Sequence, residues 1–317
     1  MTPATMQVMR VAGHLGAEVQ GVDLSRPMTA AVVEAIRAAL EEHQVLFFRA
    51  QRLDHAQQVA FAAQFGRLLA RARPQSGGEL DAFPQVWTIS PEADEAAWGF
   101  DHEEHYRSRQ RQGIGGWHTD LSDAVNPPAA SVLRADVLPS HGGDTQWTSL
   151  TAAYEGLPPE LQRFVDGLQA EHSFFAAYDM NPHDERDKAI LDVVGEPRAA
   201  LHPVVRVLPA SGRKALFINP ARVRRIVNLT PAESRHLLEL LFQEVTRPEY
   251  TVRWRWEVGD VAIWDNRSTA HVGVGDYAHL GQPRIMHRVT LHGEKPIGPG
   301  GFVSRALAGS TLDPCPA

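Results

Sequence analysis

The chain has 317 residues, of which 43% are hydrophobic and 22% are charged, an ordinary composition for a globular protein with a sizeable core. Its 38 acidic and 31 basic side chains give a formal net charge of −7, which argues against a general nucleic-acid binder. No apolar run is long enough for a membrane span or a signal peptide. Because the one cysteine, Cys315, has no partner for a disulfide within the chain, we expect a cytoplasmic protein.

The first half of the chain combines short helices with short strands. Amphipathic spacing predicts a helix over residues 30–43, and the apolar run that follows predicts a buried strand at 45–48. An aspartate in capping position begins a second predicted helix over 54–64. A further strand is expected at 86–89 and a short helix at 159–168.

The clearest helix signal begins at Thr230. Threonine at the N-cap, Pro231 at the first helical position and Glu233 three residues after the cap form a capping box. Leucine, phenylalanine and valine recur through residue 245 with the spacing of one buried face. We therefore predict a helix that begins at 231 and packs on a core.

Beyond this helix the hydrophobic period changes from 3.6 to 2. Alternation predicts strands at 251–257, 261–264 and 284–291. Helices early, strands late and no βαβ rhythm favour a mainly β fold with an antiparallel sheet system and flanking helices. No linker divides the chain, so we predict one domain over residues 1–317, with a loose tail after about residue 296 because that stretch is rich in Gly, Pro and Ser.

Histidine and carboxylate two residues apart are candidate ligands for one metal ion, because residues i and i+2 of a strand lie on the same face. A third ligand would complete the two-histidine, one-carboxylate set of non-haem Fe(II) oxygenases. The pattern alone is common, since four such pairs occur: His102/Glu104, His118/Asp120, His183/Glu185 and His292/Glu294.

Context selects one of these pairs. His118 and Asp120 lie in GGWHTD, where glycines allow close approach to the backbone, whereas the other pairs lie in charged or loop-like stretches. His271, which follows the predicted strand at 261–264, is the candidate third ligand. Taken alone, His271 would more simply be a hydrogen-bonded loop histidine.

Two arginines of the last predicted strand form a second candidate site. One face of this strand carries Arg284, Met286, Arg288 and Thr290. On a strand, the Cα atoms of the two arginines are expected about 13 Å apart. Buried without anions they would be costly, so they are either a solvated outer face or two clamps for carboxylate or sulfonate groups.

The sequence resembles the TauD/TfdA (taurine dioxygenase) family of Fe(II)- and 2-oxoglutarate-dependent dioxygenases over nearly its whole length. The motifs that carry the resemblance are GHLGAEVQGVDL (13–24), HQVLFFRAQ (43–51), AFAAQFGRL (60–68), GGWHTD (115–120), HGGDTQW (141–147), GRKALFIN (212–219), RPEYTVRWRW (247–256), VAIWDNRSTAH (261–271) and PRIMHRVTL (283–291). In combination they are far more specific than a histidine and an aspartate alone.

The resemblance implies an iron site and a cosubstrate site. His118, Asp120 and His271 match the family's iron ligands. Thr145 and Arg284 match the residues that hold the distal carboxylate of 2-oxoglutarate. The implied reaction consumes O₂, converts 2-oxoglutarate to succinate and CO₂, and oxidises a substrate C–H bond, usually by hydroxylation.

The resemblance also implies a fold and a substrate pocket. The fold is a double-stranded β-helix, or jelly roll, with helices packed outside. Arg288 matches the arginine that binds the substrate's acidic group, and the backbone N–H of Leu121 and the ring of Phe217 fall where the family lines its pocket. The expected substrate is a small organic anion such as a sulfonate, sulfate or carboxylate.

Three departures from the taurine enzymes bear on the substrate. Residues 69–74 replace a loop in which those enzymes carry a histidine and a tyrosine, and Ile114 stands where they carry an asparagine. The segment 92–112, a predicted active-site lid, is longer and more charged than its counterpart. We therefore expect an anion other than taurine, bound by Arg288 and helped by Arg71, for which a solvated loop position is an equal alternative.

Two other functions use the same residues. A metal-dependent hydrolase could hold zinc with the same three ligands, and a catalytically silent barrel could bind a small anion. A hydrolase has no use for the Thr145/Arg284 clamp, which favours the dioxygenase. No nucleic-acid or membrane partner is expected, and a homo-oligomer, dimer or tetramer, is a family-level expectation.

Overall fold

A computed structural model of the chain describes residues 6–70, 82–91, 116–176, 181, 183–194 and 197–315. Arg71, Ile114 and the predicted lid at 92–112 lie outside these residues, so the predictions made for them stay predictions.

Two facing sheets form the centre of the molecule. The large sheet has seven strands in the order β1 (Gln7–Arg10), β2 (Ala17–Gln20), β3 (Val45–Phe48), β13 (Val261–Asp265), β5 (Ala130–Val137), β15 (Ile285–Thr290) and β4 (Val86–Ile89). The smaller sheet has three, in the order β12 (Thr251–Trp254), β6 (Thr145–Ser149) and β14 (Thr269–Gly273). Apart from the parallel β2/β3 pair, the strand pairs of these sheets are antiparallel.

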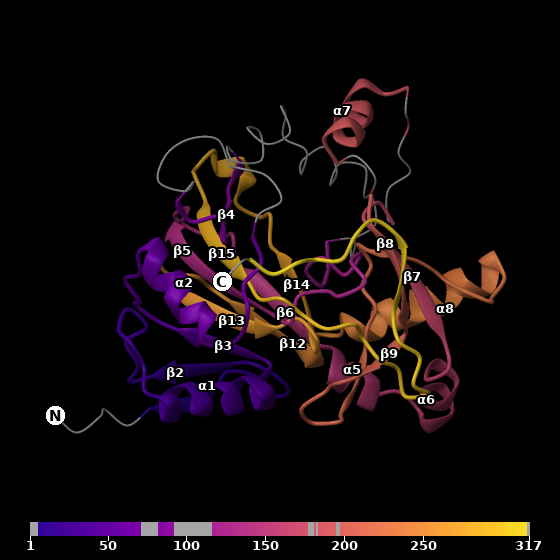
Figure 1. Cartoon of the computed structure of the whole chain (residues 1–317), viewed down its shortest axis with the longest axis horizontal. Helices are drawn as coiled ribbons and strands as arrows, with labels where there is room; N and C mark the ends of the chain where they lie inside the picture. The colour runs from indigo at the N-terminus through magenta and orange to yellow at the C-terminus, as the bar shows by residue number, and fades with distance from the viewer. Residues whose placement is uncertain are drawn as a thin grey trace.

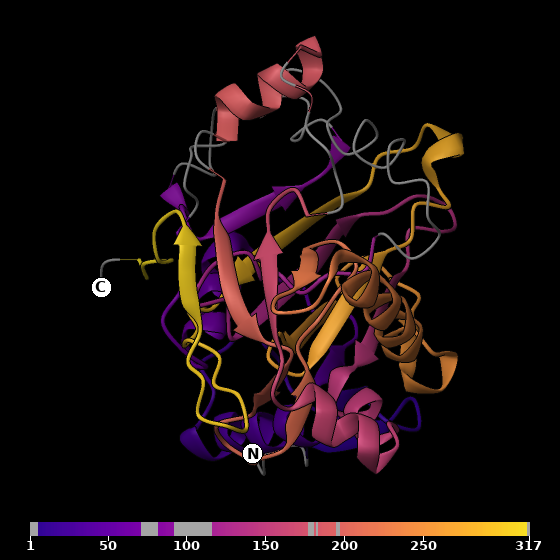
Figure 2. The ribbon, with the colours of Figure 1, turned by 90° about the vertical axis from the view of Figure 1, so that its right-hand side faces the viewer.

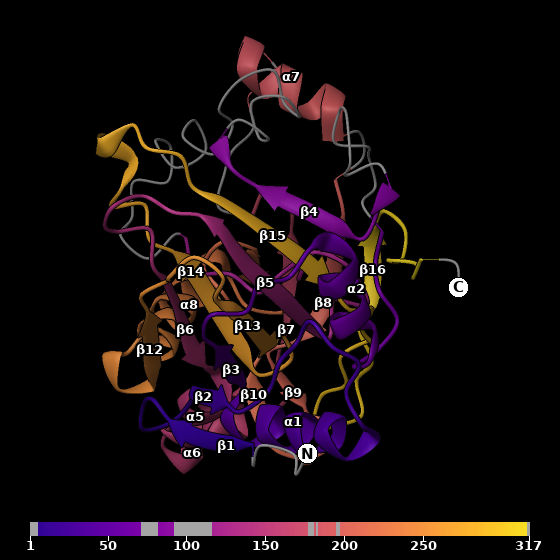
Figure 3. The ribbon, with the colours of Figure 1, turned by 90° about the vertical axis from the view of Figure 1, so that its left-hand side faces the viewer.

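Two further sheets extend this centre. One has four strands in the order β11 (Val223–Ile226), β7 (Gln169–Ser173), β8 (Ala199–Pro203) and β16 (Arg305–Ala308), and the other pairs β10 (Lys214–Leu216) with β9 (Val205–Val207). The helices are α1 (Ala30–His43), α2 (His55–Ala63), α5 (Leu150–Glu155), α6 (Pro159–Val165), α7 (Glu185–Val194) and α8 (Pro231–Val245), with short 3₁₀ turns at Pro248–Tyr250 and Ala278–Leu280. In all views α7 lies at one end of the molecule and α1 at the other (Figures 1, 2 and 3).

Alternating side chains of the large sheet build two separate layers of core. On the outer face, Val132 and Ile263 pack with residues of α1 and α2, and these helices lie across that face (Figure 3). On the inner face, Leu133 and Trp264 pack against Trp147 of the smaller sheet. This is the period-2 arrangement that the sequence predicted, with helices outside the sheets. The mainly β fold with flanking helices is confirmed.

Helix starts follow their capping residues. Thr230 and Glu233 form the predicted capping box at the start of α8, and Asp54 forms one with Gln57 at the start of α2. Strand ends differ by a few residues from the prediction, since β12 stops at Trp254 and β15 covers 285–290. Among the described residues, no helix is long and apolar enough to cross a bilayer.

The C-terminal segment is not loose as predicted. Residues 305–308 form β16, which pairs with β8 at the edge of the four-stranded sheet. Further on, the N–H of Leu312 donates to the side chain of Asn126, and the N–H of Cys315 donates to the carbonyl of Leu68 at 2.7 Å. The composition predicted a flexible tail because it carries no sign of the backbone partners that lie beneath this segment.

Candidate metal centre

A short backbone bridge brings the two candidate histidines together. His118 and His271 exchange both backbone hydrogen bonds, at 2.9 and 2.7 Å, although His271 lies on β14 and His118 belongs to no named strand. Their ring centroids are consequently 4.3 Å apart. The bridge is the local reason why two histidines far apart in sequence face the same point.

Asp120 completes the group, and a turn positions it instead of the strand that we expected. The turn begins at Asp120, and Leu121 adopts a φ of +45°, a backbone region that few residues other than glycine enter. Oδ1 of Asp120 then lies 3.9 Å from Nε2 of His118 and 3.9 Å from Nε2 of His271. Asp120 and His271 are buried and His118 is partly exposed, so the cluster has one open side.

The donor set fits a metal ion. Nδ1 of His118 lies 3.0 Å from the carbonyl of Gly116, which can only accept, so Nδ1 carries the proton and Nε2 offers a lone pair toward Asp120. Burial lowers the pKa of His271 to about 3 and lowers that of His118, so both rings are neutral at neutral pH, the form that binds metals. The three ligand atoms lie within 4.8 Å of one another.

An arginine supports the negative charge of the cluster. Nη1 of Arg288 lies 2.6 Å from Oδ1 of Asp120. Burial is the largest single effect and raises the pKa of this carboxyl, but the charge of Arg288, the two histidines and the hydrogen bond from Ser131 together lower it by more, so the pKa lies well below its usual range. Asp120 is therefore ionised, the form in which a carboxylate binds a metal ion.

The strand face that carries Arg288 points inward. Met286 of β15 belongs to the inner core layer, and its alternate neighbours Arg284, Arg288 and Thr290 share that face. Arg284 and Thr290 are buried and Arg288 is nearly so. The alternative of a solvated outer face is thus excluded.

The candidate cosubstrate residues lie beside one loop. Nε of Arg284 donates to the carbonyl of Gly143, two residues before Thr145, and a Cβ at Gly143 would come within 3.0 Å of that Nε. Nε1 of Trp256 donates to Oγ1 of Thr145 at 3.0 Å. Because an indole N–H can only donate, the Thr145 oxygen is the acceptor here, and its own hydroxyl proton can be donated to a different acceptor.

The predicted substrate residues differ in their placement. Arg288 and the backbone of Leu121 adjoin the metal cluster, the first through Asp120 and the second as its chain neighbour. Phe217 is fully buried and stacks on His172 at 5.2 Å, so in the described part of the chain its ring belongs to the packing behind the Leu121 turn. Arg71 is not among the described residues.

The remaining His-x-Glu pairs do not form comparable sites where the structure describes them. His118, Asp120 and His271 are the one potential metal-binding group found among the described residues. Glu294 instead pairs with Arg206 at 2.8 Å. The pair at 102/104 lies outside the described residues.

A polar relay behind Asp120 was not predicted from the sequence. Oγ of Ser131 donates to Oδ2 of Asp120 at 2.7 Å, Nδ2 of Asn266 donates to Ser131 at 3.0 Å, and Trp264 donates to Asn266 at 2.8 Å. The available signal was a lone serine in the apolar run of β5 and an asparagine directly after β13. Neither reveals its partner without the fold.

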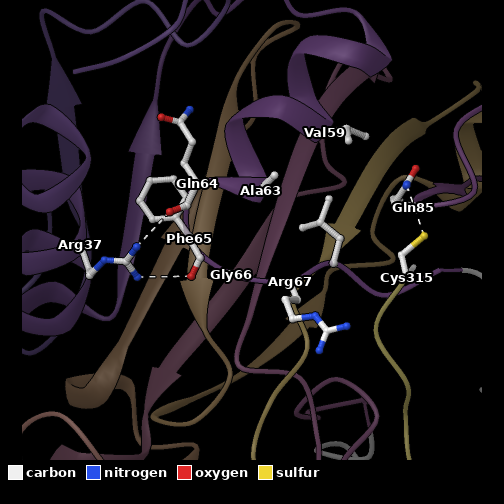
Figure 4. A pocket seen from close by; sticks show the side chains of 10 residues that line it. Arg37, Val59, Ala63, Gln64, Phe65, Gly66, Arg67, Gln85 and Cys315 are labelled. Atoms are coloured by element: carbon white, nitrogen blue, oxygen red, sulfur yellow. Dashed lines mark hydrogen bonds between the residues drawn. The ribbon is translucent and has the colours of Figure 1, made fainter. Parts of the chain in front are cut away.

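A surface groove elsewhere on the molecule is separate from this cluster. It lies between the end of α2, the residues that follow α2 and the C-terminal segment (Figure 4). Arg37 at its edge donates to the carbonyls of Gln64 and Phe65, and Gln85 approaches Sγ of Cys315. No residue of the metal cluster lines it.

Known proteins share both the sequence and the fold. The family model described as "Taurine catabolism dioxygenase TauD, TfdA family" matches residues 7–290. An α-ketoglutarate (2-oxoglutarate)-dependent sulfate ester dioxygenase of Pseudomonas putida is 44% identical over 95% of this chain and 94% of its own. An alkylsulfatase of Acinetobacter baylyi is 36% identical over 94% of this chain and 88% of its own.

Solved structures agree. The crystal structure of a taurine dioxygenase from Burkholderia xenovorans superposes with a TM-score of 0.81, at 41% identity, over 97% of this chain and 96% of that one. The structure of AAD-2 in complex with Mn(II) and N-oxalylglycine has a TM-score of 0.71 at 26% identity, over 92% of this chain and 99% of that one. The predicted jelly roll is confirmed. The chain belongs to the TauD/TfdA family and is an α-ketoglutarate-dependent dioxygenase with a potential metal site.

Proposed function

We propose that this enzyme uses Fe(II), 2-oxoglutarate and O₂ to oxidise a C–H bond of a small organic sulfate ester. The observation that carries the proposal is the convergence of two neutral imidazoles and one ionised carboxylate, next to an inward-facing arginine. Two histidines and one carboxylate form the donor set of non-haem Fe(II) oxygenases. This set leaves coordination positions open for the reactants. Bound there, iron would supply the activation of O₂ and the oxidative decarboxylation of 2-oxoglutarate.

The protein's own residues bind and orient the reactants. We assign His118, Asp120 and His271 to the metal. Arg284 and the hydroxyl proton of Thr145 are placed to hold the distal carboxylate of 2-oxoglutarate, since both are buried and adjoin one loop. A charge-assisted hydrogen bond from guanidinium is the strong interaction expected for such a carboxylate.

On the side of His271 the wall of the site is aromatic and buried. Trp264 contacts the His271 ring with centroids 4.9 Å apart, and Trp147 stacks on it from 6.4 Å. Both tryptophans are essentially fully buried. In such surroundings electrostatic interactions are stronger, and side reactions with water are suppressed.

The relatives favour a sulfate ester over taurine, because the Pseudomonas putida and Acinetobacter baylyi proteins are named for sulfate esters and alkyl sulfates. Arg288 supplies a guanidinium that can bind the sulfate group. Hydroxylation of the carbon next to the ester oxygen gives a carbon that carries both a hydroxyl and a sulfate group. That product collapses to an aldehyde and inorganic sulfate, with loss of a proton, so the C–O bond breaks without hydrolysis. The assigned roles of Leu121, Phe217 and Arg71, the homo-oligomer and the cytoplasmic location stay predictions.

Sulfate release from an alkyl sulfate tests the proposal. We expect release to require both O₂ and 2-oxoglutarate and to yield succinate and aldehyde in equal amounts. Sulfate release without O₂ or 2-oxoglutarate would indicate the metal-dependent hydrolase instead, and no turnover of any anion would indicate a silent barrel. Faster turnover of taurine than of alkyl sulfates would contradict the substrate assignment.

A further inference from the structure

The carboxylate of Asp120 is held from behind by the buried relay of Trp264, Asn266 and Ser131. All three residues of this relay are essentially inaccessible to solvent, with exposed fractions of 1% or less. Ser131 lies on β5 opposite Trp264 of β13, and Asn266 begins the connection from β13 to β14, the strand that carries His271. The relay thus joins the carboxylate ligand to the element that supplies the second histidine.

The direction of each hydrogen bond in the relay is fixed by chemistry. Trp264 can only donate, so the Asn266 oxygen accepts and its NH₂ group faces Ser131. The ionised Asp120 can only accept, so Ser131 donates to Oδ2 and accepts from Asn266. No tautomer or amide flip reverses this order, and the Ser131 proton has one place to go.

The two oxygens of Asp120 therefore have different surroundings. Oδ2 is bound by Ser131 at 2.7 Å, whereas Oδ1 is the oxygen that lies 3.9 Å from Nε2 of each histidine. Oδ1 is also the oxygen that Arg288 contacts, at 2.6 Å. One oxygen is directed at the metal site and the other is directed away from it.

We propose that Ser131 and Asn266 are positioning residues that limit Asp120 to one donor oxygen, Oδ1. This inference rests on the proposed function, because its consequence concerns coordination positions. A six-coordinate ion bound by one atom of each of three protein ligands has three positions left, enough for a bidentate keto acid and O₂. A bidentate Asp120 would occupy one of these three positions. By holding Oδ2, the Ser131 hydrogen bond keeps a position open for O₂.

Mn(II) binding to Ser131→Ala tests this without turnover. Outer hydrogen bonds to metal ligands typically account for about 10- to 100-fold in metal affinity. We expect Ser131→Ala to weaken Mn(II) binding by about this factor in an EPR titration, and Asn266→Ala to weaken it less because the serine hydroxyl remains. Ser131→Thr keeps the hydroxyl and should restore binding. Crystals of Ser131→Ala with Mn(II) should show Asp120 bidentate or rotated.

Ser234→Ala is the matched control for loss of a buried serine hydroxyl. Ser234 lies on α8, is 4% exposed, and accepts from the N–H of Ile226 at 2.8 Å, away from the metal cluster. It should lower the stability of the fold without changing Mn(II) affinity. If Ser131→Ala binds Mn(II) like Ser234→Ala, or its Asp120 keeps a single oxygen on the metal, the inference is overturned. If the unaltered protein binds no Mn(II), it is the proposed function that fails.

Discussion

Nη1 of Arg288 lies 2.6 Å from Oδ1 of Asp120, the same oxygen that faces Nε2 of both His118 and His271. The arginine comes from β15 of the large sheet, whereas His271 comes from β14 of the smaller one. The guanidinium that we propose for anchoring an anionic substrate therefore adjoins the carboxylate that we propose as a metal ligand. Under these assignments, substrate position and metal geometry are linked through this one contact.

Replacing Arg288 should separate substrate binding from metal binding. Truncating one partner of a buried charge pair typically costs 2–5 kcal/mol, so we expect Arg288→Gln to lower kcat/KM for an alkyl sulfate by about 100- to 1,000-fold. Mn(II) binding should persist, because Arg288 is not a ligand and no longer competes for Oδ1. Arg235→Gln, on the exposed face of α8, is the control. Equal losses of substrate turnover and Mn(II) affinity would show that Arg288 acts only through Asp120.

Replacing Arg284 should affect 2-oxoglutarate selectively. A hydrogen bond to a charged group contributes about 1.5–3 kcal/mol, so Arg284→Gln should raise the KM for 2-oxoglutarate by about 10- to 100-fold. Steady-state kinetics with saturating alkyl sulfate measure this directly. The KM for the alkyl sulfate should change little, because Arg288 is intact. If Arg284→Gln instead raised the KM for the alkyl sulfate and left the KM for 2-oxoglutarate unchanged, Arg284 would be the substrate residue and the assignment would be wrong.

Local patterns predicted the elements that local chemistry controls. The Thr230/Glu233 capping box places the start of α8, and alternation along β15 places Met286 and Arg288 on the inner face, with Arg284 directly before the strand. Both follow from residues within a few positions of one another. Spacing alone left four candidate pairs, of which the glycine-rich context selected His118/Asp120, and the family resemblance then supported the same residues.

Features that depend on distant backbone partners were not predictable in this way. The bridge between His118 and His271 and the docking of Cys315 on Leu68 each join segments far apart in sequence. Ser131 resembles any small residue of a buried strand until Asp120 is placed beside it. Composition near the C-terminus predicted flexibility because it contains no information about the surface that this segment covers.

Buried histidines should make the metal-free fold sensitive to mild acid. Burial lowers the pKa of His202 to about 3, whereas an unfolded histidine titrates near 6.5. Below about pH 6.5 the unfolded chain binds a proton that the folded chain rejects, so the free energy of unfolding falls as the pH falls, by up to about 3 kcal/mol for this group at pH 4. The loss through His202 levels off below about pH 3.

Denaturant unfolding of His202→Gln between pH 7 and 5 checks this. Glutamine keeps an N–H donor for the carbonyls of Ser122 and Ala124, which His202 contacts at 3.0 and 3.1 Å, but it does not titrate. We expect a shallower dependence of stability on pH than in the unaltered protein. His236→Gln, at an exposed position on α8, should keep the original dependence. Identical slopes in His202→Gln and the unaltered protein would contradict the prediction.

Anaerobic addition of Fe(II) and 2-oxoglutarate to the folded protein tests the central claim most directly, because it reports the metal and the cosubstrate at one site without any substrate. We expect a weak visible charge-transfer band that appears only when both are present. The band should be lost in His118→Ala, weakened at limiting 2-oxoglutarate in Arg284→Gln, and unchanged in His236→Ala. Correctly folded protein that gives no band, or a band that survives in His118→Ala, would contradict the assignment of this site.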